Sequence, residues 1–148
     1  MAKFQQSITV SAPPEKAYEF LADISRHAEW SGHGLQVQKT SDGPVAVGAT
    51  YSTIGKQMGT HKGEVTVTQL NPYSQITYES LDDTGHFRHG FLLAARDGGT
   101  EITKTVEPLK KGLLLTLLGP GMGLLVPRGL RADLAKIKER LEAQAPAL

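Results

Sequence analysis

The stretch ITVSAPPEKAYEFLADISRHAEW, residues 8–30, indicates the first secondary-structure elements of the fold. Residues 4–10 mostly alternate apolar and polar side chains, which predicts a strand with one face toward water. The prolines that follow end this strand. Pro14 with Glu15 predicts the start of a helix, because proline fits the first turn and a carboxylate favours the positive end of the helix dipole. A second short helix is expected within residues 25–34.

The middle of the chain consists of short β-rich runs separated by turn signals such as Asn71-Pro72 and Asp97-Gly98-Gly99. The connections are too short for parallel crossovers, so they predict an antiparallel meander. The predicted strands after the first are 35–39, 50–56, 62–70, 75–81, 87–95 and 100–107.

The C-terminal part of the sequence changes to a helical period. One apolar stripe, formed by Leu130, Leu134, Ile137 and Leu141, predicts a long amphipathic helix with charged residues such as Asp133 on its other faces. The stripe must be buried, and the meander offers the only large surface that can receive it. These patterns together predict an α+β fold.

Several different short motifs follow one another along the chain. They are Ala12-Pro13, Ala17-Tyr18, Leu21-x-Asp23, Trp30, Gly48, VTVTQLNP at residues 65–72 and Gly99-Thr100. In this order and spacing they resemble the SRPBCC superfamily, also called START-like or helix-grip proteins, and its polyketide cyclase/dehydrase-like branch. The resemblance covers nearly the whole chain.

The resemblance implies a single domain, residues 1–148, in which a curved seven-stranded antiparallel sheet grips the C-terminal helix. Two short helices are expected between the first two strands, and a cavity between the sheet and the last helix. Members of this superfamily bind lipids, sterols, plant hormones or polyketides, and some act as aromatases, cyclases or dehydrases. The fold thus implies a pocket more directly than it implies a reaction.

The alternation along each strand selects the side chains that face this cavity. They are mostly aliphatic and aromatic, with a polar group of Tyr51, Tyr78, His89 and Lys104, which suits a small apolar molecule with one or two oxygen functions. His89 and Lys104 are the candidates for catalysis; the alternatives are a core or rim histidine and a lysine that reaches out to water. Trp30 is either a core anchor or a wall of the pocket mouth. The predicted ligand-binding residues are Tyr51, Thr53, Val65, Val67, Tyr78, His89, Phe91, Lys104, Leu117, Met122, Leu125, Leu130 and Leu134.

The sequence lacks the patterns of metal, cofactor and nucleophile sites. His86 and His89 point to opposite faces of one strand and cannot chelate together. No serine lies in a Gly-x-Ser-x-Gly elbow, and GPGMG matches neither the P-loop nor the dinucleotide fingerprint. The chain has no cysteine, which suits a reducing compartment. We therefore expect no metal, no cofactor and a cytoplasmic location.

The charges are balanced and dispersed. With 16 basic and 15 acidic residues and no long run of one sign, nucleic acid is not an expected partner. The expected partner is a small hydrophobic ligand, bound by a monomer or a homodimer.

The most apolar stretch is GLLLTLLGPGMGLLVP, residues 112–127. It is shorter than the about 20 apolar residues that a bilayer span needs, and glycines and a proline break its centre. We expect either a lid over the cavity, hinged at residues 119–123, or a static plug that completes the core. Pro127 fits an early turn of the last helix or a position inside a helix begun near Pro120.

Three functions remain open from the sequence. The favoured one is a carrier or sensor that binds a hydrophobic, lipid-like or polyketide-like molecule. The second is an aromatase/cyclase-type enzyme, a lyase-like cyclase or dehydrase that works by general acid–base catalysis. The third is a protein-interaction or regulatory module that docks through the sheet or through the apolar segment.

Overall fold

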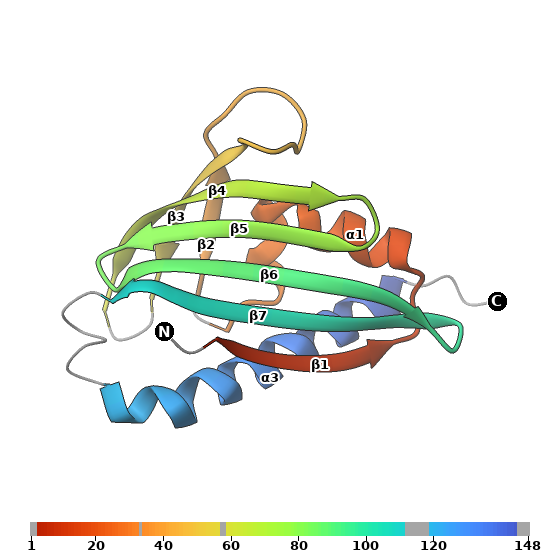
Figure 1. Cartoon of the computed structure of the whole chain (residues 1–148). Coiled ribbons are helices and arrows are strands. Elements are labelled where there is room, and N and C mark those ends of the chain that lie inside the picture. Colours follow the sequence, from red (N-terminus) through yellow and green to blue (C-terminus); the bar gives the residue numbers. More distant parts are fainter. Residues whose placement is uncertain (1–2, 33, 57–58, 112–118, 145–148) are drawn as a thin grey trace.

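Seven strands form a single antiparallel sheet (Figure 1). The computed structural model describes residues 3–32, 34–56, 59–111 and 119–144. The strands are β1 (Phe4–Val10), β2 (Gln36–Lys39), β3 (Thr50–Gly55), β4 (His61–Asn71), β5 (Gln75–Asp82), β6 (Gly85–Arg96) and β7 (Gly99–Lys111). Their spatial order is β1-β7-β6-β5-β4-β3-β2, so strands β2 to β7 pair in sequence order and β1 pairs with β7. The predicted meander is confirmed.

Helices α1 (Pro14–Ala22), η1 (Ile24–Glu29) and α3 (Gly119–Gln144) cover one face of this sheet. In Figure 1 α1 and α3 lie on the far side of the strands. The second short helix is a 3-10 helix, and Asp23 caps it because its Oδ1 accepts a hydrogen bond from the Ser25 backbone N–H at 3.0 Å. The expected α+β helix-grip architecture, with two short helices between β1 and β2, is confirmed.

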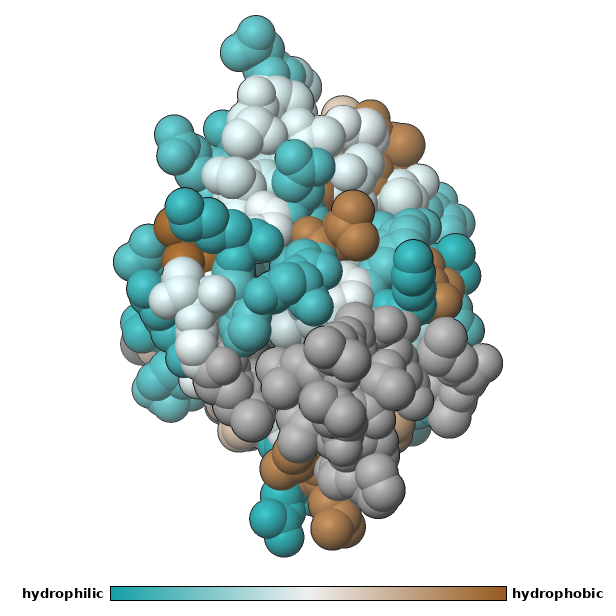
Figure 2. Space-filling model, turned by 90° about the vertical axis from the view of Figure 1, so that its left-hand side faces the viewer, coloured by the Kyte–Doolittle hydropathy of each residue, from teal (hydrophilic) through white to brown (hydrophobic). Residues whose placement is uncertain are grey.

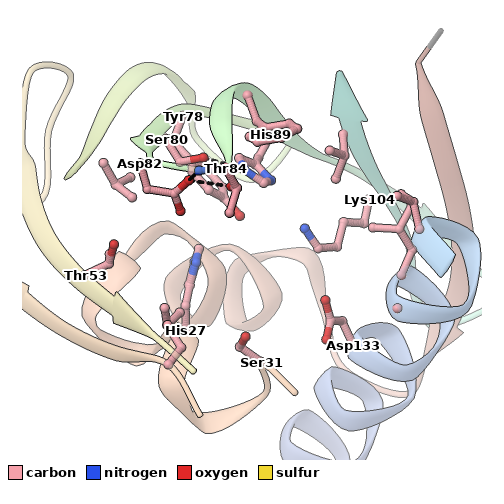
Figure 3. Close-up of a pocket in the computed structure, with 18 of the residues that line it drawn as sticks. His27, Ser31, Thr53, Tyr78, Ser80, Asp82, Thr84, His89, Lys104 and Asp133 are labelled. Carbon is pink, nitrogen blue, oxygen red and sulfur yellow. Dashed lines mark hydrogen bonds between the residues drawn. The ribbon is translucent and has the colours of Figure 1, made fainter. Parts of the chain in front are cut away.

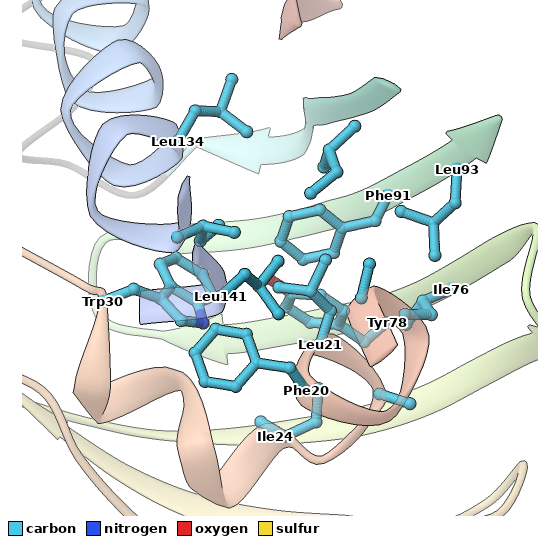
Figure 4. Close-up of a cluster of buried hydrophobic side chains, with 14 of the residues drawn as sticks. Phe20, Leu21, Ile24, Trp30, Ile76, Tyr78, Phe91, Leu93, Leu134 and Leu141 are labelled. Atoms are coloured by element: carbon cyan, nitrogen blue, oxygen red, sulfur yellow. The ribbon is translucent and has the colours of Figure 1, made fainter. Parts of the chain in front are cut away.

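The core lies between the inner face of the sheet and the helices (Figure 4). Phe20 and Leu21 of α1, Ile24 of η1 and Phe91 of β6 are at most 1% exposed. The Trp30 ring meets the Phe91 ring edge-on, with centroids 5.9 Å apart. Because burying each large apolar side chain contributes about 1.5–3 kcal/mol, this cluster fixes both short helices against β6.

The long helix α3 packs on the same core through its predicted stripe. Leu134, Ile137 and Leu141 are at most 2% exposed. The C-terminal half of the helix is also tied to the end of β1, because the Ser11 backbone N–H donates to Glu142 Oε2 at 2.9 Å. The end of α3 is thereby fixed on the sheet.

Asp133 departs from the predicted polar face of this helix. It is only 9% exposed. Leu130 lies three residues before it and Ile137 four residues after it, so all three share one face at helical spacing. The expectation that Asp133 faces water is wrong, because the buried face of α3 includes position 133 in addition to the apolar positions of the stripe.

Helix α3 begins at Gly119 and contains Pro127 in its interior. This settles the two readings of Pro127 in favour of a helix begun near Pro120. Residues 112–118 lie outside the described part of the chain, as do the side chains of residues 119–123. The lid and the plug therefore both stay predictions.

Candidate functional site

A cavity of about 590 Å³ lies between the inner face of the sheet, η1 and α3. Strands β3 to β7 supply one wall, and η1 and α3 supply the others. Apolar side chains such as Val65, Val106 and Leu130 make up much of the lining, and the polar groups gather in a few places (Figure 3). This combination of apolar walls and few polar groups is typical of small-molecule sites.

The amine of Lys104 is buried inside this cavity. Lys104 pairs with Gln6 of β1 and Phe91 of β6, and the strand alternation turns its side chain inward. It is 3% exposed. Its Nζ lies 5.4 Å from the ring centroid of Trp30 and 5.2 Å from that of Phe91. Such cation–π contacts stabilise the ammonium form in an otherwise apolar place.

Asp133 of α3 faces Lys104 of β7 across the cavity (Figure 3). Burial lowers the pKa of Lys104 to about 8, and the carboxylate of Asp133 opposes that shift. At neutral pH Lys104 is therefore mainly a cation, with a minor uncharged fraction.

His27 of η1 contributes a neutral imidazole. Its Nε2 lies 2.9 Å from the Leu21 carbonyl oxygen, which can only accept, so Nε2 carries the proton. Burial lowers the pKa of His27 to about 3, and the ring is neutral at pH 7 with Nδ1 as an acceptor. The ring packs 4.6 Å from the Trp30 ring and 5.2 Å from the Tyr78 ring, between centroids.

Tyr78, His89 and Ser80 form a second polar group on β5 and β6. The rings of Tyr78 and His89 stack with centroids 4.9 Å apart and an interplanar angle of 8°. Burial, helped by the charge of Lys104, lowers the pKa of His89 well below its ordinary value. Burial raises the pKa of Tyr78, so its phenol also stays neutral.

The hydrogen bond of His89 determines what Ser80 offers to the cavity. His89 Nε2 lies 2.9 Å from Ser80 Oγ, and the buried Nδ1 has no hydrogen-bond partner within the described ranges. A buried N–H without an acceptor is costlier than a bare lone pair, so the favoured tautomer carries its proton on Nε2 and donates to Ser80. The Ser80 hydroxyl proton is then left to donate elsewhere.

The end of the cavity near β3 is lined by Thr53, Asp82 and Thr84. Asp82 Oδ1 accepts from the Thr84 backbone N–H at 2.8 Å and also from the Thr84 hydroxyl. Gly63 pairs with Thr53, and a Cβ on Gly63 would come 2.8 Å from the Asp82 Cβ. A glycine therefore keeps this end of the sheet open for the two polar side chains.

The predicted ligand-binding residues divide into two sets. Those that line the cavity are Thr53, Val65, Tyr78, His89, Lys104, Leu125 and Leu130. Those that lie in the core behind the wall, each at most 1% exposed, are Tyr51, Val67, Phe91 and Leu134. Leu117 lies outside the described residues, and the side chain of Met122 is not among those described. Trp30 belongs to the core and also lines the cavity.

The sequence did not predict eight polar residues that line the cavity: His27, Ser31, His61, Ser80, Asp82, Thr84, Arg128 and Asp133. Ser80 and Asp82 continue the period of two that begins at Tyr78, so the alternation contains their signal. His27 lies three residues after a buried apolar residue of the same 3-10 helix, and positions i and i+3 of such a helix share a face. Asp133 lies on the buried face of α3 described above.

The outer surface at one end of the molecule is mostly hydrophilic, with separate hydrophobic spots (Figure 2). Leu125 lies at the rim of the cavity, since it lines the cavity and is 54% exposed.

Within the described ranges no group of three or more histidine, aspartate or glutamate side chains could hold a metal ion. None of the helices in the described part of the chain is long and apolar enough to cross a membrane.

The whole fold is shared with solved structures. The Zhui aromatase/cyclase from Streptomyces sp. R1128 superposes with a TM-score of 0.79 at 19% identity, covering 99% of this chain and 96% of that one. A protein from Thermus thermophilus gives a TM-score of 0.76 at 14% identity, over 98% and 100% of the two chains. The di-domain aromatase/cyclase StfQ of the steffimycin biosynthetic pathway gives 0.76 at 13% identity, over 96% of this chain and 51% of that one.

The sequence itself places the chain in a family. No curated protein matches it significantly. Residues 1–142, however, match the family described as polyketide cyclase/dehydrase and lipid transport. This match covers nearly the whole chain, and the seven-stranded sheet around α3 agrees with the fold of the solved structures. The chain therefore belongs to the polyketide cyclase/dehydrase and lipid transport family.

Proposed function

We propose that the chain binds a small hydrophobic molecule, lipid-like or polyketide-like, in the cavity between the sheet and α3, and acts as a carrier or sensor. The observation that carries this proposal is the cavity of about 590 Å³ with apolar walls and a buried ammonium group on Lys104. Apolar walls supply the burial energy, and a few fixed polar groups set the orientation of the ligand.

The polar groups favour a ligand with an oxygen acceptor. Lys104 donates as an ammonium ion, and Ser80 has a hydroxyl proton to donate because His89 occupies its lone pair. A carbonyl or phenolate oxygen fits such donors. A purely hydrocarbon ligand would leave the Lys104 charge without a partner from the ligand, which costs binding energy.

The test of this proposal combines native mass spectrometry with a blocked cavity. We expect protein purified from its own cell to retain a small molecule, and a hydrophobic ketone such as 2-acetylnaphthalene to raise the melting temperature. Thr53→Phe places an aromatic ring in the cavity and should reduce both effects. Ser52→Phe, next to it on the opposite face of β3, is the matched control and should keep them.

Two results would overturn the proposal. One is a protein that retains no small molecule and shows no thermal shift with any hydrophobic carbonyl compound. The other is an equal thermal shift in the Thr53→Phe variant, which would place the ligand outside the cavity.

A cyclase or dehydrase activity is the second candidate, and the convergence of acid–base groups on one cavity favours it. Lys104 can polarise a carbonyl oxygen, the neutral His89 and Asp133 can accept protons, and Tyr78 can donate one. General acid–base groups contribute about 10²- to 10⁴-fold each. Similar solved structures include aromatase/cyclases, which supports this candidate at the level of the fold.

The enzyme hypothesis is tested with a short poly-β-ketoacyl thioester, whose spontaneous cyclisation products are compared with those formed in the presence of protein. If the chain is a cyclase, it shifts the product distribution, and Lys104→Met and His89→Gln lower the rate at least about tenfold. Lys62→Met, at an exposed position of β4, is the control. Identical products with and without protein would leave binding as the function.

A further inference from the structure

Lys104 differs from the other lysines of the described ranges in its burial. Its side chain is 3% exposed, and no other lysine is among the buried residues there. It extends from the middle of β7 into the cavity, where a bound molecule would lie beside it (Figure 3). The position places a primary amine inside an apolar site and away from bulk water.

The surroundings hold this amine toward the cavity. The rings of Trp30 and Phe91 lie 5.4 Å and 5.2 Å from Nζ. Three titratable groups that share an electrostatic interaction with Lys104 also line the cavity: His27, His89 and Asp133. Both imidazoles are neutral at pH 7, so Asp133 is the ionised group that faces the amine.

A nucleophilic amine must be uncharged for part of the time. With the pKa of Lys104 at about 8, about one molecule in ten carries the free amine at pH 7. A lysine with the ordinary value of 10.5 does so in about one molecule in 3,000. Desolvation of a lysine in an apolar pocket is a recognised way to activate it toward carbonyl compounds.

We propose that Lys104 forms an imine with the aldehyde or ketone group of a molecule held in the cavity. This inference rests on the proposed binding function, because the carbonyl compound must first occupy the cavity. It names the ligand class as a hydrophobic aldehyde or ketone, and it makes retention of that ligand covalent and reversible.

The reaction balances without a redox partner. The Nζ lone pair attacks the carbonyl carbon, and the π electrons move to oxygen while a proton passes from nitrogen to that oxygen, which gives a carbinolamine. The nitrogen lone pair then forms the C=N bond as the hydroxyl leaves as water. Asp133 is the acid–base group of both steps: in each it takes one proton from nitrogen and gives one to oxygen, so both amine protons leave in the water and the imine is neutral.

The test uses 2-naphthaldehyde as the probe and sodium cyanoborohydride to reduce any imine to a stable secondary amine at pH 7. We expect intact mass spectrometry to show the addition of one naphthylmethyl group, and peptide mapping to place it on Lys104. Lys104→Met and Lys104→Arg should lose this modification, and the arginine variant keeps the charge if the methionine variant folds poorly. Lys62→Met is the matched control and should be modified like the original chain.

Binding is measured separately with 2-naphthalenemethanol, which has the same ring system but no carbonyl group. A thermal shift with the alcohol, together with a probe that labels all lysines equally slowly, overturns the imine and leaves the binding function standing. Absence of a shift with either compound overturns both proposals. Asp133→Asn should slow the labelling of Lys104 at least about tenfold without abolishing the shift caused by the alcohol; unchanged labelling removes Asp133 from the mechanism.

Discussion

Lys104 and Asp133 are buried on opposite walls of one cavity, at a cost that the fold does not need to bear. An apolar pair of similar volume in these positions would spare the desolvation of both charges. Ionisable groups with shifted pKa values that converge on a cavity are characteristic of functional sites. The two side chains are thus better explained by what they do to a bound molecule than by the stability of the protein.

Lys104 should make the free energy of unfolding rise with pH in the alkaline range. Its folded pKa of about 8 is below the ordinary 10.5, so above pH 8 the unfolded chain binds a proton that the folded chain has lost. The free energy of unfolding should therefore rise between pH 8 and pH 10 by up to about 1.4 kcal/mol per pH unit from this residue. Urea unfolding at several pH values should show this rise relative to Lys104→Met. Parallel curves for the two proteins would contradict the prediction.

His27 has the corresponding effect in acid. Its pKa of about 3 in the folded state is below the ordinary 6.5, so the unfolded chain takes up a proton first as the pH falls. Stability should be lost progressively below pH 6.5. His27→Gln keeps an amide N–H for the Leu21 carbonyl but cannot titrate in this range. Between pH 6.5 and pH 4.5 we expect the variant to lose less unfolding free energy than the original chain, by up to about 1.4 kcal/mol per pH unit. An equal loss would show that His27 is charged in the fold.

The sequence predicted the polar residues of the strands better than those of the helices. Alternation places His89 and Lys104 on the inner face with no further information, because a strand has only two faces. Asp133 and His27 lie on helices, where the width of the buried face depends on what packs against it. The sequence alone does not show that the sheet leaves a cavity there that admits a polar side chain.

At the scale of elements, the β6–β7 hairpin and the end of β1 meet at one glycine. A Cβ on Gly99 would collide with the backbone carbonyl of Val10. Gly99→Ala should therefore lower the free energy of unfolding by about 1–3 kcal/mol, because the backbone itself must shift. The control is Gly129→Ala in α3, where nothing lies within 4 Å and alanine should add about 0.5–1 kcal/mol. Effects of the same sign in urea unfolding would contradict this account.

The elements themselves were largely predictable, and their ends were not. The period of two gave the strands, but β7 continues to Lys111, past the predicted end at residue 107. It does so across Pro108, which sits opposite Phe87 beside a register shift in β6. Helix α3 likewise begins at Gly119, although glycines and prolines are poor helix formers. At the end of β7, pairing with β6 decides against the local preference of the sequence.

At the scale of the whole molecule, the sheet and α3 leave a cavity between them. A fold optimised for stability alone would fill this space with side chains. Empty or hydrated space lacks the contacts of a packed interior, so a side chain that fills it should stabilise the fold. Thr53→Phe would place its ring over Gly63, its partner on β4, beside the Asp82 side chain. We expect the ligand-free variant to melt at a higher temperature than the original chain, while Ser52→Phe on the outer face gives no such gain. Calorimetry on ligand-free protein measures the difference. A lower melting temperature for Thr53→Phe would mean that the cavity wall is already closely packed. A higher melting temperature combined with lost ligand binding would show that this fold gives up stability to keep its cavity open.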